Sequence, residues 1–270
     1  MGIVISSGLV LGVDDSILPL DHPRIMYDDI LRGAVLTPST EAVGFEAINV
    51  NDYLTYDFWR PTALPATLEV ETEEARPVDY VLIAAHTLGS AATSVLAQYH
   101  NGATWVTFGE NLQVLPGSNL PVVFLFEEVM SNRFLFTFTG SEIPSIGVVM
   151  MGRALAVERK LYRGHTPIML GRKTTIRPSR SENGQWLGRS IRREGVATEI
   201  ALSNLTASWV REKLDPFIES ARVYPFGWAW RPADFPAEVA YCWTLADIKP
   251  VNTGPRDLMG VTFGVEGSIE

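Results

Sequence analysis

The chain has 270 residues, of which 46% are hydrophobic and 20% are charged, and its formal net charge at pH 7 is -9. This composition is that of a folded globular protein and excludes an intrinsically disordered chain. Because phosphate backbones repel a net negative surface, the charge also argues against specific nucleic-acid binding. The length favours two domains, with one large β domain as the alternative.

Cysteine and histidine usage limits the chemistry that the chain can carry. Cys242 is the one cysteine, which excludes an internal disulfide framework, and no Cys and His spacing matches a zinc site. We therefore expect no metal and no cofactor. The N-terminal run MGIVISSGLVLGV lacks a basic start and meets Asp14 and Asp15 directly, so it does not fit a signal peptide. No apolar run approaches the ~20 residues of a membrane span.

The first half is filled with short β-branched and aromatic runs separated by turn residues, which predicts an all-β fold. In RFLFTFTG the residues Phe134, Phe136 and Phe138 alternate with others, so all three point to one side of a strand. That apolar face predicts the core of a β-sandwich. Asn101 and Gly102 lie between two strand-like runs and predict a hairpin. The other runs are TLEVETEE, DYVLIAAHTLG, SVLAQYH, TWVTFG and VVFLFEEV.

The sequence changes character near Ala154, where it becomes basic and rich in glycine. We therefore assign residues 1–27 to an N-terminal arm, 28–153 to the β-sandwich and 154–270 to a second β domain. This second domain carries one amphipathic helix near 206–222, with Asn204 or Thr206 as its N-cap. Pro216 should kink or restart that helix. Strand-like runs surround it: GVATEIAL, PFGWAW, VAYCWTL and LMGVTFGVEG.

Positive charge is concentrated in one stretch. Positions 156–193 hold 10 Lys/Arg against 2 Asp/Glu, whereas 1–155 hold 6 against 18 and 194–270 hold 6 against 11. Arginine is enriched at interfaces, so head-to-tail packing of identical subunits is one interpretation, and a solvated Arg-rich hairpin is the alternative. The interface candidates are Arg172, Lys173, Arg177, Arg180, Trp186, Arg189, Arg192 and Arg193.

The segment GFEAINVNDYLTYDFWRP and the strand runs that follow it resemble the galactose-binding-like, discoidin-type jelly roll. Ala47, Asn49, Asp52 and Trp59 match that pattern, and the resemblance covers roughly residues 28–153. Such domains bind sugars, lipids, proteins or nothing, so the resemblance implies a fold more than a function. Core packing is the favoured interpretation of the aromatic cluster. The alternative is a weak glycan contact through Tyr53, Tyr56, Asp57 and Trp59.

The second half resembles tail proteins of long-tailed bacteriophages, of the tail-tip or distal-tail type. The motifs that carry this resemblance are GHTPIMLGRKTTIRP, SENGQWLGRSIRREG, LDPFIESAR, PFGWAWRPADFP and NTGPRDLMGVTFGVEG. The resemblance implies a tail-tube-like β domain with one flanking helix. It also implies a ring, a hexamer or trimer, that contacts other tail proteins in the virion after assembly in the host cytoplasm.

Function is therefore expected to be structural and non-enzymatic. No nucleophile elbow, phosphate loop or zinc helix occurs, and the four histidines, His22, His86, His100 and His165, are scattered, so we expect no catalytic residue. The alternatives are a carbohydrate-binding module that attaches to a host-surface glycan and a degenerate glycan hydrolase.

Overall fold

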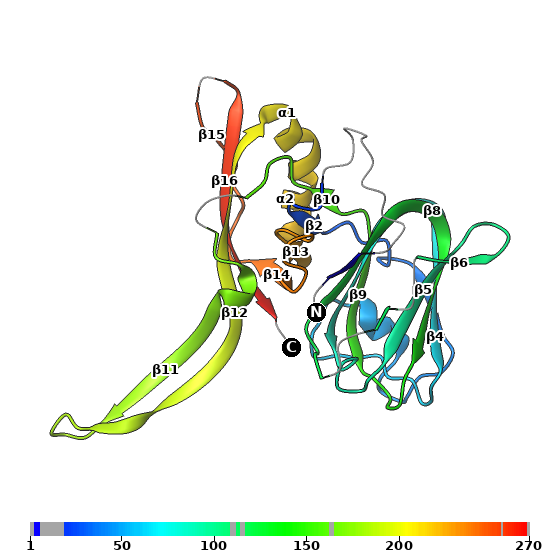
Figure 1. The fold of residues 1–270 in the computed structure, drawn as a ribbon, viewed down its shortest axis with the longest axis horizontal. Coiled ribbons are helices and arrows are strands. Elements are labelled where there is room, and N and C mark those ends of the chain that lie inside the picture. The colour runs from blue at the N-terminus through cyan, green and yellow to red at the C-terminus, as the bar shows by residue number, and fades with distance from the viewer. Residues whose placement is uncertain are drawn as a thin grey trace.

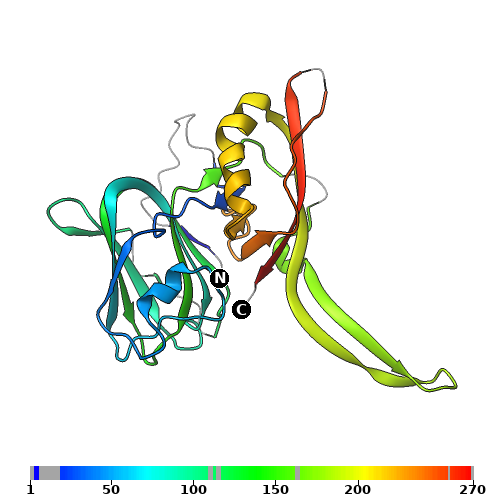
Figure 2. The same ribbon diagram turned by 180° about the vertical axis from the view of Figure 1, so that it is seen from behind.

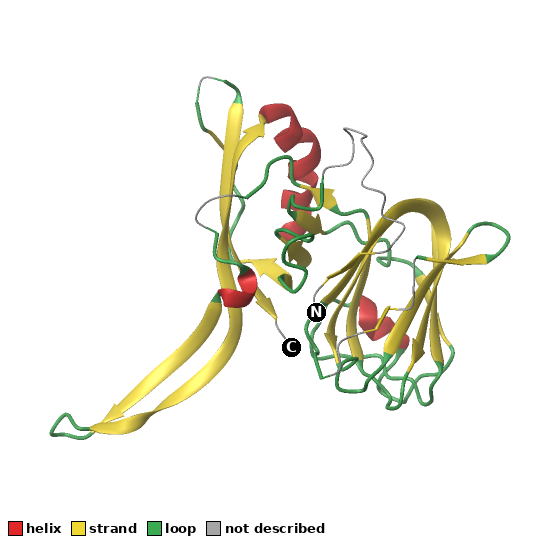
Figure 3. Cartoon of the chain, viewed as in Figure 1, coloured by secondary structure: helices red, strands yellow, loops and turns green. Residues whose placement is uncertain are grey.

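The computed structural model describes residues 3–5, 19–108, 112–113, 117–161, 165–254 and 256–268 (Figure 1). Strands dominate the described part, and they form two sheets (Figure 3). The first sheet runs in the order β3 (Val35–Pro38), β4 (Ala66–His86), β8 (Val122–Thr139), β5 (Ser94–His100) and β6 (Trp105–Thr107). Beside this path, β1 (Ile3–Ile5) pairs with β8, β7 (Leu112–Gln113) with β5, and β9 (Ile146–Gly152) with β4.

The second sheet runs in the order β10 (Leu155–Ala156), β2 (Arg24–Met26), β13 (Phe226–Ala229), β14 (Val239–Thr244), β16 (Leu258–Ser268), β12 (Trp186–Thr206) and β11 (Arg172–Arg180). A further strand, β15 (Val251–Asn252), pairs with β16. The described helical segments are the 3-10 turns η1 (Ala47–Asn51) and η2 (Ile168–Leu170), then α1 (Ala207–Trp209), the π-helical η3 (Val210–Leu214) and α2 (Asp215–Ala221).

The β-sandwich arises because β4 and β8 are long and bend together. Their pairing shifts register between Glu71 and Arg76, so each strand contributes its two halves to different layers. The half of β4 before the bend pairs with β3 and β8, and the half after it pairs with β8 and β9. One continuous sheet thereby folds over to cover its own apolar face.

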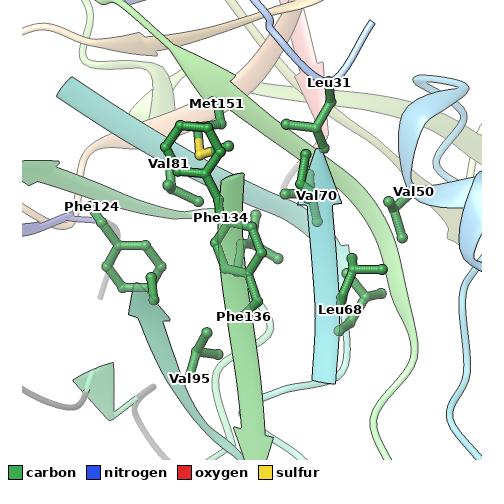
Figure 4. Packing of buried hydrophobic residues seen from close by; sticks show 14 of the residues in the cluster. Leu31, Val50, Leu68, Val70, Val81, Val95, Phe124, Phe134, Phe136 and Met151 are labelled. Atoms are coloured by element: carbon green, nitrogen blue, oxygen red, sulfur yellow. The ribbon is translucent and has the colours of Figure 1, made fainter. Parts of the chain in front are cut away.

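The sandwich core is built from the alternation that the sequence displays. Phe134, Phe136 and Phe138 of β8 are at most 1% exposed. They pack in one core with Val81 of β4 and Met151 of β9 from the opposite layer. Figure 4 shows Phe134 and Phe136 beside these two residues. The prediction that these three Phe share one buried face is confirmed, because a period-two pattern sends alternate side chains to the same side of a strand.

The layer made of β9 and the second half of β4 is buried on both faces. Every residue of β9 is buried, and one of its faces joins the sandwich core. Its other face packs against the second sheet, where Val148 and Met150 cluster with Met26, Val239 and Tyr241. Figures 1 and 2 show the sandwich and the second sheet side by side. The apolar run IGVVMMG lacks alternation because neither face of this strand meets water.

The helical segment covers the far face of the second sheet. Phe217 of α2 lies between Phe226 of β13 and Phe263 of β16, with ring centroids 4.9 and 6.1 Å away. Thr206 caps the helix, because its hydroxyl accepts a hydrogen bond from the backbone N–H of Trp209. The π-helical turn η3 comes directly before α2, whose second residue, Pro216, lacks an N–H for regular helical bonding.

The fold class is as predicted: all-β, with an N-terminal β-sandwich and a following β region flanked by one helical segment. The chain passes from the first sheet to the second at residues 153–154, between β9 and β10. Residues 24–26, which the sequence analysis assigns to an N-terminal arm, form the strand β2 inside the second sheet. Segments that precede and follow the sandwich in sequence therefore build one sheet together.

Asp79 supports this crossing point. Its carboxylate accepts a hydrogen bond of 2.7 Å from the backbone N–H of Ala154, and the guanidinium of Arg24 lies near it. Burial raises the pKa of Asp79 to about 7, against an ordinary value of 3.8, and the hydrogen bond and Arg24 offset only part of that effect.

Stability should therefore fall as the pH rises from about 4 to about 7. In that range the folded protein keeps a proton on Asp79 that the unfolded chain releases, so each rise in pH favours the unfolded state; above about 7 both states are ionised and the loss is complete. Asp79→Asn keeps an acceptor for Ala154 and removes the ionisation. We expect it to raise the free energy of unfolding near pH 8 by on the order of 1 kcal/mol or more and to change it little near pH 4. Urea unfolding of both proteins at the two pH values checks this, and an equal effect at both would contradict it.

Candidate functional site

The outer face of the five-stranded part of the first sheet carries polar and aromatic side chains. Cross-strand pairing places Glu69 of β4, Leu135 of β8, Gln98 of β5 and Thr107 of β6 in one row across the sheet. In the next row, Glu71 pairs with Arg133, and His100 pairs with Trp105. These side chains point away from the sandwich core, because their neighbours in each strand fill that core. We call Glu69, Gln98, His100, Trp105 and Arg133 the Trp105 face.

The contacts within the Trp105 face hold it in one arrangement. Arg133 donates from Nε and Nη2 to the Oε1 atom of Glu69, at 3.1 and 2.5 Å. Its guanidinium also lies over the Trp105 indole, 5.5 Å from the ring centroid. The His100 ring meets the indole edge to face at 5.2 Å. Glu69 raises the pKa of Arg133, so the guanidinium stays charged throughout the physiological range.

Local sequence positions the aromatic residue. His100 and Trp105 flank the four-residue turn of a hairpin, in which Asn101 accepts hydrogen bonds from the backbone N–H groups of Ala103 and Thr104. The hairpin predicted from Asn101 and Gly102 is confirmed, and Gly102 has the positive φ of 93° that the turn requires. Trp105 is partly exposed at the end of this hairpin. The indole is therefore presented on a rigid strand pair.

The residues considered as glycan contacts do not form one surface. Trp59 is fully buried in the sandwich core, where its ring packs edge on against Phe138 at 5.5 Å and its indole N–H donates to the Thr40 carbonyl. Its indole therefore has no face open to a sugar, so core packing, the favoured interpretation, is confirmed for Trp59 and the alternative of a glycan contact is wrong for it. Tyr56 is 69% exposed, and Asp57 is partly exposed.

Tyr53 has a structural position between the two sheets. Its hydroxyl donates to Asp29 at 2.7 Å and accepts from Arg32 at 3.1 Å. The Tyr241 hydroxyl donates to the Tyr53 carbonyl, and the centroid of the Tyr224 ring lies 5.3 Å from that of the Tyr53 ring. Desolvation and the neighbouring Asp29 carboxylate raise its pKa far above the ordinary value. Tyr53 therefore connects the sandwich to the second sheet and is a poor candidate for glycan contact.

The interface candidates fall on one long hairpin formed by β11 and β12. Lys173 is paired at its base with Glu266 of β16, 2.6 Å away. Trp186, beside the turn, is 60% exposed, so it is no core residue of its own chain. The side chain of Arg193 lies outside the part that the structure describes. Beyond Lys173 and Trp186, the described side chains among these candidates are exposed: Arg172, Arg177, Arg180, Arg189 and Arg192.

Sequence reasoning missed the Trp105 face because the needed signal is spread over four strands. The alternation in SVLAQYH already sends Gln98 and His100 to the outer side, opposite the buried Val95 and Ala97. The pairing of β5 with β6 and β8 that brings Trp105 and Arg133 beside them depends on the register of the sheet. A single strand pattern does not contain that register.

No family model matches the chain, and no curated protein matches it. Solved structures do resemble part of it. One is a pectin-binding carbohydrate-binding module, at 14% identity and a TM-score of 0.39, covering 44% of this chain and 89% of the module. Another is a Clostridium perfringens module in complex with GalNAc-β-1,3-galactose, at 13% identity and a TM-score of 0.41, covering 47% of this chain and 100% of that one. A Ruminococcus gnavus GH29 fucosidase in complex with fucose matches at 15% identity and a TM-score of 0.41, over 48% of this chain and 27% of the fucosidase.

The comparisons give no support to the tail-tip assignment. Within the described ranges, no cluster of three or more His, Cys, Asp or Glu residues could hold a metal ion. The described helices include none that is both long and apolar enough to cross a membrane. What the chain binds has to be inferred from its own side chains.

Proposed function

We propose that this protein binds a carbohydrate chain through the Trp105 face, and that it does so without catalysis. The observation that carries the proposal is a partly exposed indole held beside an ion pair and an amide on the outer surface of the sheet. Trp105 supplies the indole, Arg133 and Glu69 the ion pair, and Gln98 the amide.

Sugars need two kinds of contact, and the Trp105 face offers both. The C–H face of a pyranose ring is apolar and packs on an aromatic ring, and tryptophan gives the largest such surface. Sugar hydroxyls donate and accept hydrogen bonds. Arg133 donates only, ionised Glu69 accepts only, and Gln98 does both. Because the strands carry these groups in rows across an open sheet, the face suits an extended chain better than a small enclosed ligand.

Trp105→Ala should weaken glycan binding at least about tenfold, equal to about 1.4 kcal/mol, because the stacking surface is lost. The measurement is a glycan array with the intact protein, followed by calorimetric titration of the best ligand. Tyr56→Ala is the matched control, since it removes an aromatic ring that is 69% exposed and lies outside the Trp105 face. Assays of reducing-sugar release on the same ligands should show no turnover.

Three results would refute the proposal. The first is a wild-type protein that binds no glycan on the array. The second is a Tyr56→Ala variant that loses binding while Trp105→Ala keeps it. The third is release of reducing ends by the wild-type protein, which would replace a binding function with a hydrolytic one.

A structural role in a phage tail tip is the second candidate function. One observation favours a role in assembly: the long basic hairpin that extends from the second sheet (Figure 2). Detection of the protein in purified tailed virions would support this candidate, and its absence from such particles would count against it.

A further inference from the structure

The hairpin of β11 and β12 extends beyond the body of the protein. Strand β12 pairs with β16 from Val196 onward, and the hairpin before that point consists of two strands with no third strand beside them in the described part. Both views show it pointing away from the sandwich (Figures 1 and 2). We call residues 172–193 the arm. An isolated two-stranded ribbon is marginally stable in water, so a long one is expected to gain from a partner.

The two faces of the arm differ in chemistry. Ile176 and Ile191 are directly paired across the strands, and they are 50% and 54% exposed. Arg177 and Arg192 belong to the neighbouring pairs and therefore share the opposite face. Near the turn, Leu187 is 65% exposed. Arg189 pairs with Pro178, two residues along each strand from the Ile pair, and therefore shares its face. The arm thus presents the Ile pair with the Arg189 guanidinium group on one face and the guanidinium groups of Arg177 and Arg192 on the other, with no core of its own chain to cover them.

Charge indicates what the arm binds. The arm holds seven Lys/Arg and one Asp/Glu, a net charge of +6, so the rest of this -9 chain carries -15. A second copy therefore offers an acidic surface at the concentration of the protein itself. A polyanion such as nucleic acid would satisfy the arginines but would leave the Ile pair in water, and it would be repelled by the remaining surface.

A matching acidic surface lies where β4 and β8 bend. Five exposed glutamates lie within these two strands at the bend, and we call them the Glu bend: Glu71, Glu73, Glu74, Glu127 and Glu128. Met130, in the same part of β8, is 61% exposed and adds an apolar contact point. The arm cannot reach the Glu bend of its own chain, because it extends from the far side of the second sheet (Figures 1 and 2).

We propose that the arm of one copy docks on the Glu bend of a second copy. The contact is head to tail, since it joins two different surfaces and leaves one free arm and one free bend at the ends of any open chain of subunits. The face of the arm that carries the Ile pair lies on the bend, where the Arg189 guanidinium meets carboxylates and the Ile pair packs near Met130. Such an interface strengthens with protein concentration and weakens as salt screens the charges.

Sedimentation velocity of the intact protein tests the proposal. From about 1 to about 100 µM, we expect the wild type to shift from monomer to larger species, and raising salt from about 0.1 to about 0.5 M should reverse the shift. Arg189→Glu should weaken association at least about tenfold, and so should Glu73→Arg with Glu74→Arg. Circular dichroism and thermal melting show whether each variant is folded. Ile176→Ser with Ile191→Ser tests the apolar face without changing charge.

Mixing the two charge-reversed proteins provides the decisive measurement. Each has one intact and one reversed surface, so the reversed arm and the reversed bend should attract one another and restore a complex in the mixture. Recovery of that complex supports the proposal. A wild type that stays monomeric at every concentration, association that neither reversal weakens, or a mixture that stays monomeric would each overturn it. Binding of heparin or DNA by the arm of a monomeric wild type would assign the arm to a polyanion instead.

Discussion

Phe136→Ala should lower the free energy of unfolding by about 3–5 kcal/mol, which is the range for truncating a fully buried aromatic side chain. Phe136 is 1% exposed and packs in the sandwich core between the two layers that the bend in β4 and β8 creates. Its loss leaves a cavity that the rigid strands can only partly close. For a chain of this length, the melting temperature should fall by on the order of 10 °C.

Thr137→Ala is the matched control for that substitution. Thr137 is the next residue of β8, points to the outer face and is partly exposed. We expect it to change the free energy of unfolding by no more than about 1 kcal/mol. Urea unfolding followed by tryptophan fluorescence measures both variants. Equal losses for the two would show that β8 does not direct Phe136 into the core.

Gly152→Ala should destabilise the protein by on the order of 3 kcal/mol or more, because the added methyl group has no room. A Cβ at Gly152 would lie 1.9 Å from the carbonyl oxygen of Asp28, which is backbone and cannot rotate away. Two hydrogen bonds fix the neighbouring residue Met151. Its carbonyl accepts from the backbone N–H of Ile30 at 2.7 Å, and its backbone N–H donates to the Asp29 carboxylate at 3.2 Å. Relief of the clash would break this connection between β9 and the segment that follows β2.

Gly264→Ala provides the control, since it places the same methyl group on another strand. The nearest atom to a Cβ at Gly264 is the Cδ1 of Leu245 at 3.6 Å, an ordinary contact distance. We expect a change within about 1 kcal/mol. Thermal melting of both variants checks the pair, and a Gly152→Ala protein as stable as wild type would mean that the two backbones do not approach this closely.

The fold was largely predictable from local pattern. Alternation in RFLFTFTG and the Asn101 and Gly102 turn each depend on a few neighbouring residues, and both are found as predicted. Of the two predicted caps, Asn204 and Thr206, the structure has Thr206. The run IGVVMMG, which was not among the predicted strands, forms β9 and is covered on both faces. Which elements cover it depends on β2, β13 and β14, which are far away in the sequence.

The candidate site was less predictable, for a physical reason. Side-chain chemistry can be recognised in sequence, but a binding face is a set of neighbours across strands, and the pairing register that creates neighbours is a property of the whole sheet. Core packing of Trp59 was the favoured prediction, and its ring is in the core. Trp105 and Arg133, separated by 28 positions, are brought together outside the core, and no local pattern predicted that contact.

The sequence by itself determined the all-β class, the buried face formed by Phe134, Phe136 and Phe138, and the basic character of the arm, because each follows from composition or from short-range periodicity. Only the tertiary structure decided that β2 joins the second sheet, that the Trp105 face exists and that the arm extends free of its own acidic surface. These features require contacts between residues far apart in the chain. Such contacts depend on how whole sheets bend and pack, which no local pattern encodes.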